Sequence, residues 1–284
     1  MAYISKYDII RSTLQKAVRR GNLNLVEKCC RYLIKKNDSD WLKRRLFAIV
    51  FEECWGYTYK LNINSDLESV IYEYKIIAGL AKNRNASGLG VLGYELSEGN
   101  KSVLQHDSGD TAIRKIAKGL KDPGKFWKWI ERLKLSDKQI LMVYKAHKGY
   151  SKASRWDKAM ALAAAYLAVK DKIPQIKQVT KKTNMPLWVA LDKHTVIGRK
   201  AIRSVAKSEG TKYNIAKWYS FYFESVISNE SKNCYWWNRE KEWRFNSLGI
   251  SIQEAEEIWN KLKPKVRKLL KTESNNLKKR LSRN

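Results

Sequence analysis

Residues 192–195 read Asp-Lys-His-Thr, which places a carboxylate, a primary amine, an imidazole and a hydroxyl in four consecutive positions. A lysine whose pKa is lowered forms a Schiff base with a carbonyl carbon, and a neighbouring carboxylate assists the proton transfers. This is the chemistry of a base-excision glycosylase or lyase. If the protein is an enzyme, we therefore expect Lys193, Asp192 and His194 to be its catalytic residues.

A structural role for the same segment is the alternative. Side chains that are adjacent on a helix point in different directions, so the four groups would not meet on one substrate if residues 192–195 were helical. In that case Asp192 would pair with Arg199 or Lys200, and His194 would fill a polar niche. The sequence leaves both interpretations open.

A second set of candidate ligands lies in the segment Gln-His-Asp-Ser-Gly-Asp at residues 105–110. His106, Asp107 and Asp110 have the donor types of a divalent-metal site, which His147 or His194 would have to complete. This arrangement would suit a metal-dependent nuclease. The alternative is that these residues only solvate a loop, with Asp110 capping the helix that follows. We assign no metal to the protein on this basis.

Two glycine patterns between residues 83 and 110 resemble phosphate-binding motifs without their context. Gly88, Gly90 and Gly93 form a GxGxxG, and residues 99–102 read Gly-Asn-Lys-Ser. A dinucleotide fingerprint follows a buried strand, and a phosphate loop needs Gly-Lys-Ser/Thr without an intervening residue. We therefore expect no cofactor.

The charge balance indicates the class of partner. The chain has 284 residues and 57 Lys and Arg against 28 Asp and Glu, a formal net charge of +29. Self-repulsion of this size does not stabilise a compact fold, so the excess indicates a polyanion as partner. We expect nucleic acid, DNA rather than RNA. An acidic protein partner, or a lysine-rich composition with no specific partner, is the alternative.

The cations concentrate at the ends of the first three expected helices and in residues 181–217 and 261–284. Cations contact phosphates and aromatic rings stack on unpaired bases, so these two segments and the Trp-rich segment 233–249 are our candidate nucleic-acid contacts. The candidate residues are Lys181, Lys182, Arg199, Lys200, Arg203, Lys207, Arg239, Arg244, Trp237, Lys265, Arg267 and Lys268.

The segment 233–249 could form a stacking platform from tryptophans and cations, namely Trp236, Trp237, Trp243, Arg239, Lys241 and Arg244. The alternative is that these tryptophans are core, because tryptophan at helical spacing is usually buried. We place Trp41, Trp156 and Trp218 in the core.

Four arginines near the N-terminus also have two interpretations. They would contact phosphates, or they would pair internally with Glu52 and Glu53. They are Arg19, Arg20, Arg44 and Arg45.

The apolar pattern predicts an all-α protein, a multi-helix array, because apolar residues recur at the helical period and there are only four prolines. The expected helices cover about 6–20, 23–36, 40–55, 66–82, 111–120, 123–134, 137–148, 155–170, 197–208, 211–229 and 251–272, and Pro174 and Pro186 mark two further helix starts. Residues 83–110 lack the period and predict a long irregular loop. We therefore divide the chain into an N-terminal array (1–82), this loop (83–110), a C-terminal helical domain (111–272) and a frayed basic tail (273–284).

The cysteine content and the lack of long apolar segments indicate the cellular setting. Four cysteines are too few for a secreted disulfide scaffold, and Cys29 and Cys30 are neighbours that are poorly placed to bridge each other. No stretch approaches 18 uncharged apolar residues, and the first residues lack a signal-peptide core. We expect a reducing intracellular setting, in the cytoplasm or on the nucleoid, without a membrane partner.

Two stretches of the chain resemble a known family. Residues 14–22 (LQKAVRRGN), 31–33 (RYL), 42–46 (LKRRL) and 52–56 (EECWG) resemble the C-terminal helical region of the RarA/MgsA recombination-factor ATPases, relatives of the Werner-helicase-interacting ATPase. The helical stretch that begins at Trp156 resembles a later helix of that region. The similarity covers about 13–56 and 156–200, and the ATPase core with its Walker A motif is absent.

The resemblance implies a stand-alone collar-like helical domain. In the family this region assembles the oligomer and acts at replication forks with single-stranded DNA and its binding protein. It transfers no catalytic residue to this chain, because the catalysis of the family lies in the missing core.

These observations leave three hypotheses about function. The first is a non-catalytic DNA-binding accessory protein in replication, recombination or repair, which forms a homo-oligomer or binds other replication or repair proteins. The second is an enzyme acting on DNA, either a lyase that uses Lys193 and Asp192 or a metal-dependent nuclease. The third is a module that binds an acidic protein and no nucleic acid.

Overall fold

The computed structural model describes residues 8–62, 66–104, 110–179, 185–225 and 233–282. These residues form helices joined by short connectors, and no strand occurs among them. The all-α multi-helix array predicted from the sequence is therefore confirmed. None of the helices in these ranges is both long and apolar enough to cross a membrane.

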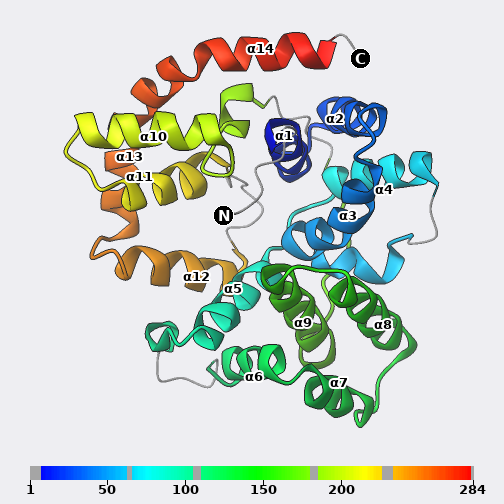
Figure 1. The fold of residues 1–284 in the computed structure, drawn as a ribbon. Coiled ribbons are helices and arrows are strands. Elements are labelled where there is room, and N and C mark those ends of the chain that lie inside the picture. The colour runs from blue at the N-terminus through cyan, green and yellow to red at the C-terminus, as the bar shows by residue number, and fades with distance from the viewer. Residues whose placement is uncertain (1–7, 63–65, 105–109, 180–184, 226–232, 283–284) are drawn as a thin grey trace.

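The first helices pack against one another in the upper half of the molecule (Figure 1). They are α1 (Asp8–Arg19), α2 (Leu23–Lys35), α3 (Ser39–Glu53), the 3₁₀ turn η1 (Trp55–Lys60) and α4 (Leu67–Gly79). Local capping sets the starts of two of them: the Asn22 side chain accepts from the Leu25 N–H, and Asp66 accepts from the Ser69 N–H. These bounds agree with the sequence expectation to within a few residues.

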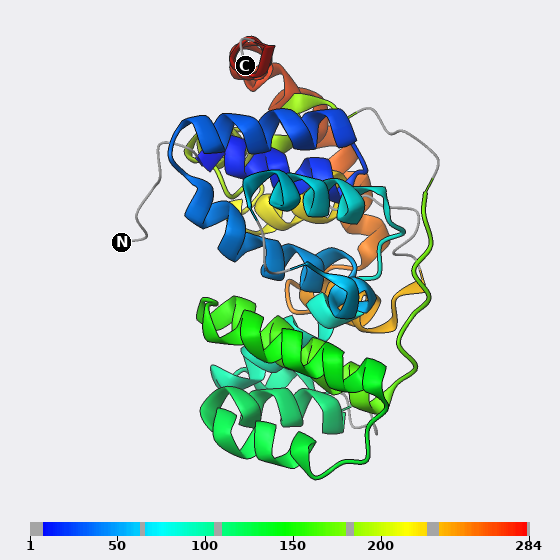
Figure 2. The same ribbon diagram turned by 90° about the vertical axis from the view of Figure 1, so that its right-hand side faces the viewer.

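A second group of helices forms the lower half of the molecule (Figure 2). It contains α5 (Asn85–Ser97), α6 (Asp110–Lys121), α7 (Pro123–Glu131), α8 (Asp137–Ser151) and α9 (Arg155–Lys170). α5 packs against α6 and α9 and also against α12 (Tyr235–Asn246), so this helix joins parts of the chain that are far apart in sequence.

The irregular loop predicted for residues 83–110 is wrong over most of its length. Residues 85–97 form α5, and a short 3₁₀ turn, η2, covers Lys101–Val103. The glycines lie at close helix contacts: a Cβ added at Gly88 would lie 2.2 Å from the Trp236 carbonyl oxygen, and one at Gly90 would lie 2.9 Å from Met160 Cα. Because α5 is buried on nearly all sides, it carries no polar face and so shows no helical period.

The third group covers the C-terminal part of the chain. It begins with the 3₁₀ turn η3 (Leu187–Ala190) and continues through α10 (Val196–Ser208), α11 (Tyr213–Ser220), the π-helical turn η4 (Phe221–Ser225), α12, α13 (Ile252–Leu269) and α14 (Lys271–Ser282). The frayed tail predicted for residues 273–284 is wrong as far as Ser282, because α14 is a helix whose Leu277 and Leu281 are buried. α14 lies across the top of the molecule (Figure 1).

After α9, residues 171–179 form an extended segment. It runs along one side of the molecule toward the third group of helices (Figure 2). The Val179 N–H donates to the Gly79 carbonyl at 2.8 Å, and the Ala81 N–H donates to the Lys177 carbonyl at 2.8 Å. The helix start predicted at Pro174 is therefore wrong. Pro186 is followed only by η3, which is a single short turn.

Candidate functional site

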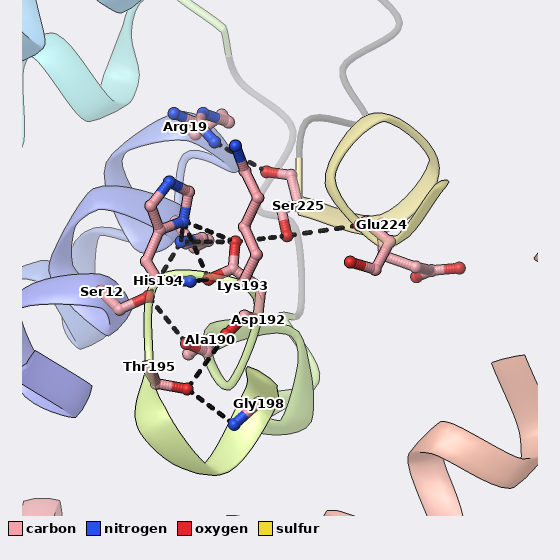
Figure 3. Close-up of polar contacts among 12 residues, drawn as sticks. Ser12, Arg19, Ala190, Asp192, Lys193, His194, Thr195, Gly198, Glu224 and Ser225 are labelled. Carbon is pink, nitrogen blue, oxygen red and sulfur yellow. Dashed lines mark hydrogen bonds and ion pairs between the residues drawn. The ribbon is translucent and has the colours of Figure 1, made fainter. Parts of the chain in front are cut away.

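The segment Asp192–Thr195 is a turn between η3 and α10, and not a helix. Thr195 caps α10 by accepting from the Gly198 N–H at 3.0 Å, and its hydroxyl donates to the Asp192 carbonyl at 3.1 Å (Figure 3). The helical arrangement that would have separated the side chains of residues 192–194 is therefore absent.

Asp192 is the centre of a buried hydrogen-bond network (Figure 3). Its carboxylate accepts from Lys16 Nζ on α1 at 2.9 Å and from the Ser225 hydroxyl at the end of η4 at 2.9 Å. It also accepts from the His194 backbone N–H at 2.9 Å. Burial alone would raise the pKa of Asp192, but His194 and Lys16 outweigh it and hold this pKa well below its usual range. Asp192 therefore stays ionised and positions its neighbours.

The predicted partners of Asp192 are wrong. Arg199 donates to the Lys193 carbonyl at 3.2 Å, and Lys200 is exposed on α10. The partner that the structure supplies is Lys16, which is fully buried and also donates to the Ser12 hydroxyl at 2.8 Å.

Asp192 fixes the orientation of His194. The Nδ1 atom lies 3.0 Å from each carboxylate oxygen of Asp192. Nδ1 also lies 3.3 Å from Lys16 Nζ, a donor, but the two carboxylate oxygens are nearer and only accept, so we assign the proton to Nδ1, which leaves the lone pair on Nε2. Desolvation by the surrounding walls lowers the pKa of His194, and Lys16 and Lys193 add to this against the effect of Asp192. The ring is 46 % exposed, so a neutral imidazole with a free acceptor faces the pocket described below.

Lys193 extends its amine over two aromatic rings. Its Nζ lies 3.8 Å from the centre of the Trp218 ring and 4.2 Å from that of Phe221. Burial lowers the pKa of Lys193 to about 7, with Arg244 and Lys16 acting in the same direction and Asp192 against them. Ring faces favour an ammonium, so they limit this lowering. Among the described residues, the amine has no carboxylate within ion-pair distance.

Lys193 and His194 line a pocket of about 600 Å³ where the three groups of helices meet. We call it the central pocket. Its aromatic walls are Trp41, Trp156, Trp218, Phe221 and Trp237. The expectation that Trp41, Trp156 and Trp218 are core residues is wrong, because Trp41 and Trp218 are only partly buried, Trp156 is exposed, and all three form pocket walls.

Arginine side chains that line the central pocket are held by ion pairs with carboxylates. Glu53 accepts from Arg19 on α1 and from Arg84 before α5, each at 2.6 Å. Burial alone would raise the pKa of Glu53, but the two guanidinium groups outweigh it and lower this pKa to about 2. Arg45 joins Glu52 at 2.6 Å and Asp157 at 2.8 Å.

Internal pairing is thus the observed role of Arg19 and Arg45, while Arg20 donates to the Glu224 carbonyl and Arg44 is exposed.

Several pocket residues were not among the sequence candidates. Arg84 precedes α5, and Asp157 and Glu240 come from α9 and α12; the sequences of these segments give no sign that they converge. Glu240 is 2 % exposed, and its Oε2 has no hydrogen-bond partner in the described part of the chain. Burial raises the pKa of Glu240, although Arg244 and the Tyr222 hydroxyl act against this.

The stacking platform predicted for residues 233–249 is wrong. Trp236, Trp237 and Trp243 are buried, and only Trp237 reaches the central pocket. Arg239 is buried against Asp110. Arg244 is buried too, and it pairs with Glu95 at 3.2 Å and Glu240 at 3.5 Å, so these two arginines are not surface phosphate contacts.

The metal-site alternative gains no support. No cluster of three ligand side chains occurs in the described ranges. Asp110 faces Arg239, and His147 packs edge-on against Trp127 with ring centres 4.8 Å apart. His106 and Asp107 lie outside the described residues, as do Lys181 and Lys182 of the nucleic-acid candidates.

A second hollow, of about 710 Å³, lies between η3 and helices α13 and α14. We call it the basic groove. Pro186, Leu187 and Trp188 contribute apolar surface, and five cations but no carboxylate line it. The cations are Lys263, Arg267, Lys268, Lys271 and Lys278.

The remaining basic candidates lie near the groove. Lys200, Arg203 and Lys207 are exposed on one face of α10, which packs against α13. Lys265 pairs with Glu209 at 2.5 Å. Only Lys263 of the groove cations has an ion pair with a described residue, Glu224.

Comparisons with known proteins assign the chain to no family. No family model matches it, and no curated protein or solved structure gives a significant match. The site must therefore be interpreted from its own geometry.

Proposed function

We propose that this chain is a DNA-binding accessory protein in replication, recombination or repair, which holds the phosphate backbone in its basic groove. The observation that carries the proposal is the groove itself, where five cations and no carboxylate line one continuous hollow. Four of them, Arg267 and Lys268 on α13 and Lys271 and Lys278 on α14, have no ion pair with a described residue.

The sequence gives this surface a plausible ligand. A formal net charge of +29 favours a polyanion, and phosphates are bound mainly by lysine and arginine. The apolar surface of Leu187 and Trp188 beside the cations suits a sugar or base next to the phosphate. The resemblance of residues 13–56 to the RarA/MgsA collar region agrees with a role at replication forks.

The test is the salt dependence of DNA binding. We compare the triple variant Lys268→Ala, Lys271→Ala, Lys278→Ala with a control triple, Lys118→Ala, Lys121→Ala, Lys128→Ala, on the exposed surface of α6 and α7 at the opposite end of the molecule (Figure 1). Both variants remove the same charge. Binding isotherms of a labelled oligonucleotide are measured at several concentrations of NaCl.

We expect the groove variant to bind more weakly and to lose roughly 0.9 per phosphate contact, about 3 in all, from the slope of log K against log salt. The control triple keeps a slope near that of the unmodified chain. Equal losses in the two variants, or an affinity that does not change between about 50 and 200 mM salt, would refute the groove as the binding surface.

A further inference from the structure

The central pocket is lined by the amine of Lys193 and by the imidazole of His194, which Asp192 orients, and the basic groove uses neither group. We propose that Lys193 forms a Schiff base with the C1′ aldehyde of an abasic nucleotide that enters this pocket. The inference rests on the proposed DNA binding for its substrate class, and it adds a lyase activity to it.

The first support is the setting of the Lys193 amine. A lysine becomes a nucleophile when desolvation and nearby cations disfavour its charged form. Lys193 meets this condition, since no carboxylate pairs with its Nζ in the described part of the structure and its pKa is lowered. Lys16, on α1, differs from Lys193 in both respects. It is fully buried and paired with Asp192, so it cannot attack a ligand.

The second support is the Asp192–His194 pair. Asp192 is fixed by Lys16 and Ser225 and in turn holds Nδ1 of His194 at 3.0 Å. The imidazole therefore presents Nε2 to the pocket as a proton acceptor. Figure 3 shows that the side chains of Lys193 and His194 leave the turn in the same general direction, toward the side of Arg19.

The third support is the rest of the pocket wall. A volume of about 600 Å³ is in the range of ligand sites, and five aromatic rings offer stacking surfaces to a nucleotide. Glu240 Oε2 and Arg84 Nε are buried without a hydrogen-bond partner in the described residues. Both residues line the pocket, so its wall also offers a carboxylate and a guanidinium group to a polar ligand.

The reaction balances without a metal or a redox partner. The Lys193 nitrogen adds to C1′ of the ring-opened sugar, and loss of water gives the protonated imine. His194 Nε2 then takes a proton from C2′, and the C3′–O3′ bond breaks with its electron pair leaving on the phosphate oxygen. Hydrolysis of the unsaturated imine returns the free amine.

The experiment is borohydride trapping of the full-length chain on an end-labelled oligonucleotide that carries one abasic site. Borohydride reduces an imine to a stable amine, so a covalent protein–DNA adduct is expected. Peptide mapping of the adduct by mass spectrometry identifies the modified lysine in the unmodified chain, without a variant that could misfold.

Three variants sharpen the result. Lys193→Arg replaces the amine by a guanidinium group, which does not form the Schiff base, and should abolish trapping. Lys217→Arg changes another lysine whose Nζ lies 5.5 Å from the same Trp218 ring but outside the pocket lining, and should trap normally. His194→Gln should still form the imine but slow strand cleavage by about 10²–10⁴-fold, as expected for a lost general base.

The outcomes separate this inference from the proposed DNA binding. Salt-dependent binding of the abasic oligonucleotide without a trapped adduct, or an adduct on a lysine other than Lys193, overturns the lyase and leaves the DNA-binding proposal standing. Trapping of deoxyribose 5-phosphate alone, with no adduct on abasic DNA, overturns the assignment of an abasic strand as substrate.

Discussion

The carboxylate of Asp192 holds the imidazole of His194 through Nδ1, at 3.0 Å from each oxygen, and Lys16 holds the same carboxylate from the opposite end of the sequence at 2.9 Å. Lys16 and Asp192 are both almost completely buried. A buried carboxylate with three donors besides the histidine ring is a rigid support, so the orientation of the histidine depends on a contact between α1 and the turn before α10.

Replacing Asp192 by Asn should release His194 and destabilise the fold. The variant leaves Lys16 buried without its counter-charge, and loss of one partner of a buried ion pair costs about 3–5 kcal/mol. Urea unfolding measures this loss. Nitrogen NMR of the His194 ring should show the proton on Nδ1 in the unmodified chain and a mixture of tautomers in the variant; a proton on Nε2 in the unmodified chain would contradict the assignment.

Replacing Glu53 by Gln should remove a pH-dependent part of the stability. The folded pKa of about 2 lies below the ordinary value of about 4.3. Ionised Glu53 therefore stabilises the fold above about pH 4.3, and this contribution is lost as the pH falls toward 2.

At neutral pH the variant leaves Arg19 and Arg84 buried without their shared carboxylate, so we expect a loss of about 3–5 kcal/mol and a weaker decline of stability in acid. The control is Glu68→Gln, at an exposed carboxylate that contacts Arg31. It should change neither the stability at neutral pH nor its decline in acid by much. Unfolding curves from pH 7 to pH 3 test both variants, and an unchanged acid decline in Glu53→Gln would count against the assignment.

Lys193 should make the protein more stable as the pH rises. Its folded pKa of about 7 lies below the ordinary value of about 10.4, so between these values the unfolded chain keeps a proton that the folded protein has lost. The free energy of unfolding then increases with pH across this interval. Asp192, Lys16, Arg244 and Glu240 are the charged groups that act on this amine.

Lys193→Met should flatten that increase, and Lys200→Met on the exposed face of α10 should retain it. Chemical unfolding at pH 6.5, 8 and 9.5 provides the measurement. The same slope in Lys193→Met and the unmodified chain would show that the amine is charged in the folded protein at these pH values.

The close contact between α5 and α9 should not tolerate even one added carbon. A Cβ at Gly90 would lie 2.9 Å from Met160 Cα, which is backbone and cannot move aside easily. Gly90→Ala should therefore destabilise by about 1–3 kcal/mol despite its better helix propensity. Gly124→Ala, where the nearest atom is 3.7 Å away, should be neutral or slightly stabilising in the same thermal unfolding assay.

Two leucines test how α14 is attached. Leu277 is 2 % exposed and Leu269, at the end of α13, is 52 % exposed. Leu277→Asp should release α14 from η3 and α2, raise its hydrogen exchange and weaken DNA binding in the basic groove, since α14 supplies Lys271 and Lys278. Leu269→Asp carries the same new charge and should leave the exchange of α14 unchanged; equal exchange in both variants would argue against this docking.

Local pattern was sufficient to predict most of the helices. The helical period placed α1–α4, α6–α10 and α13 close to their observed bounds, because the buried face of an amphipathic helix is visible as a repeat of apolar residues in its own sequence. α5 was not predicted for the same reason. A helix that is buried on all sides has no polar face, so its sequence shows no helical repeat. The excess of positive charge was also visible from composition alone.

Tertiary structure decided the candidate site. Asp192, Lys193 and His194 were identified as reactive types, but their partners Lys16, Ser225, Trp218 and Phe221 come from other elements, and Lys16 precedes Asp192 by most of the chain. Tertiary structure also decided the role of the tryptophans. Residue type alone does not show which of them lie in the core and which line the pocket. Secondary structure follows from neighbours in sequence, whereas a pocket is set by contacts between distant helices, and those contacts exist only once the chain has folded.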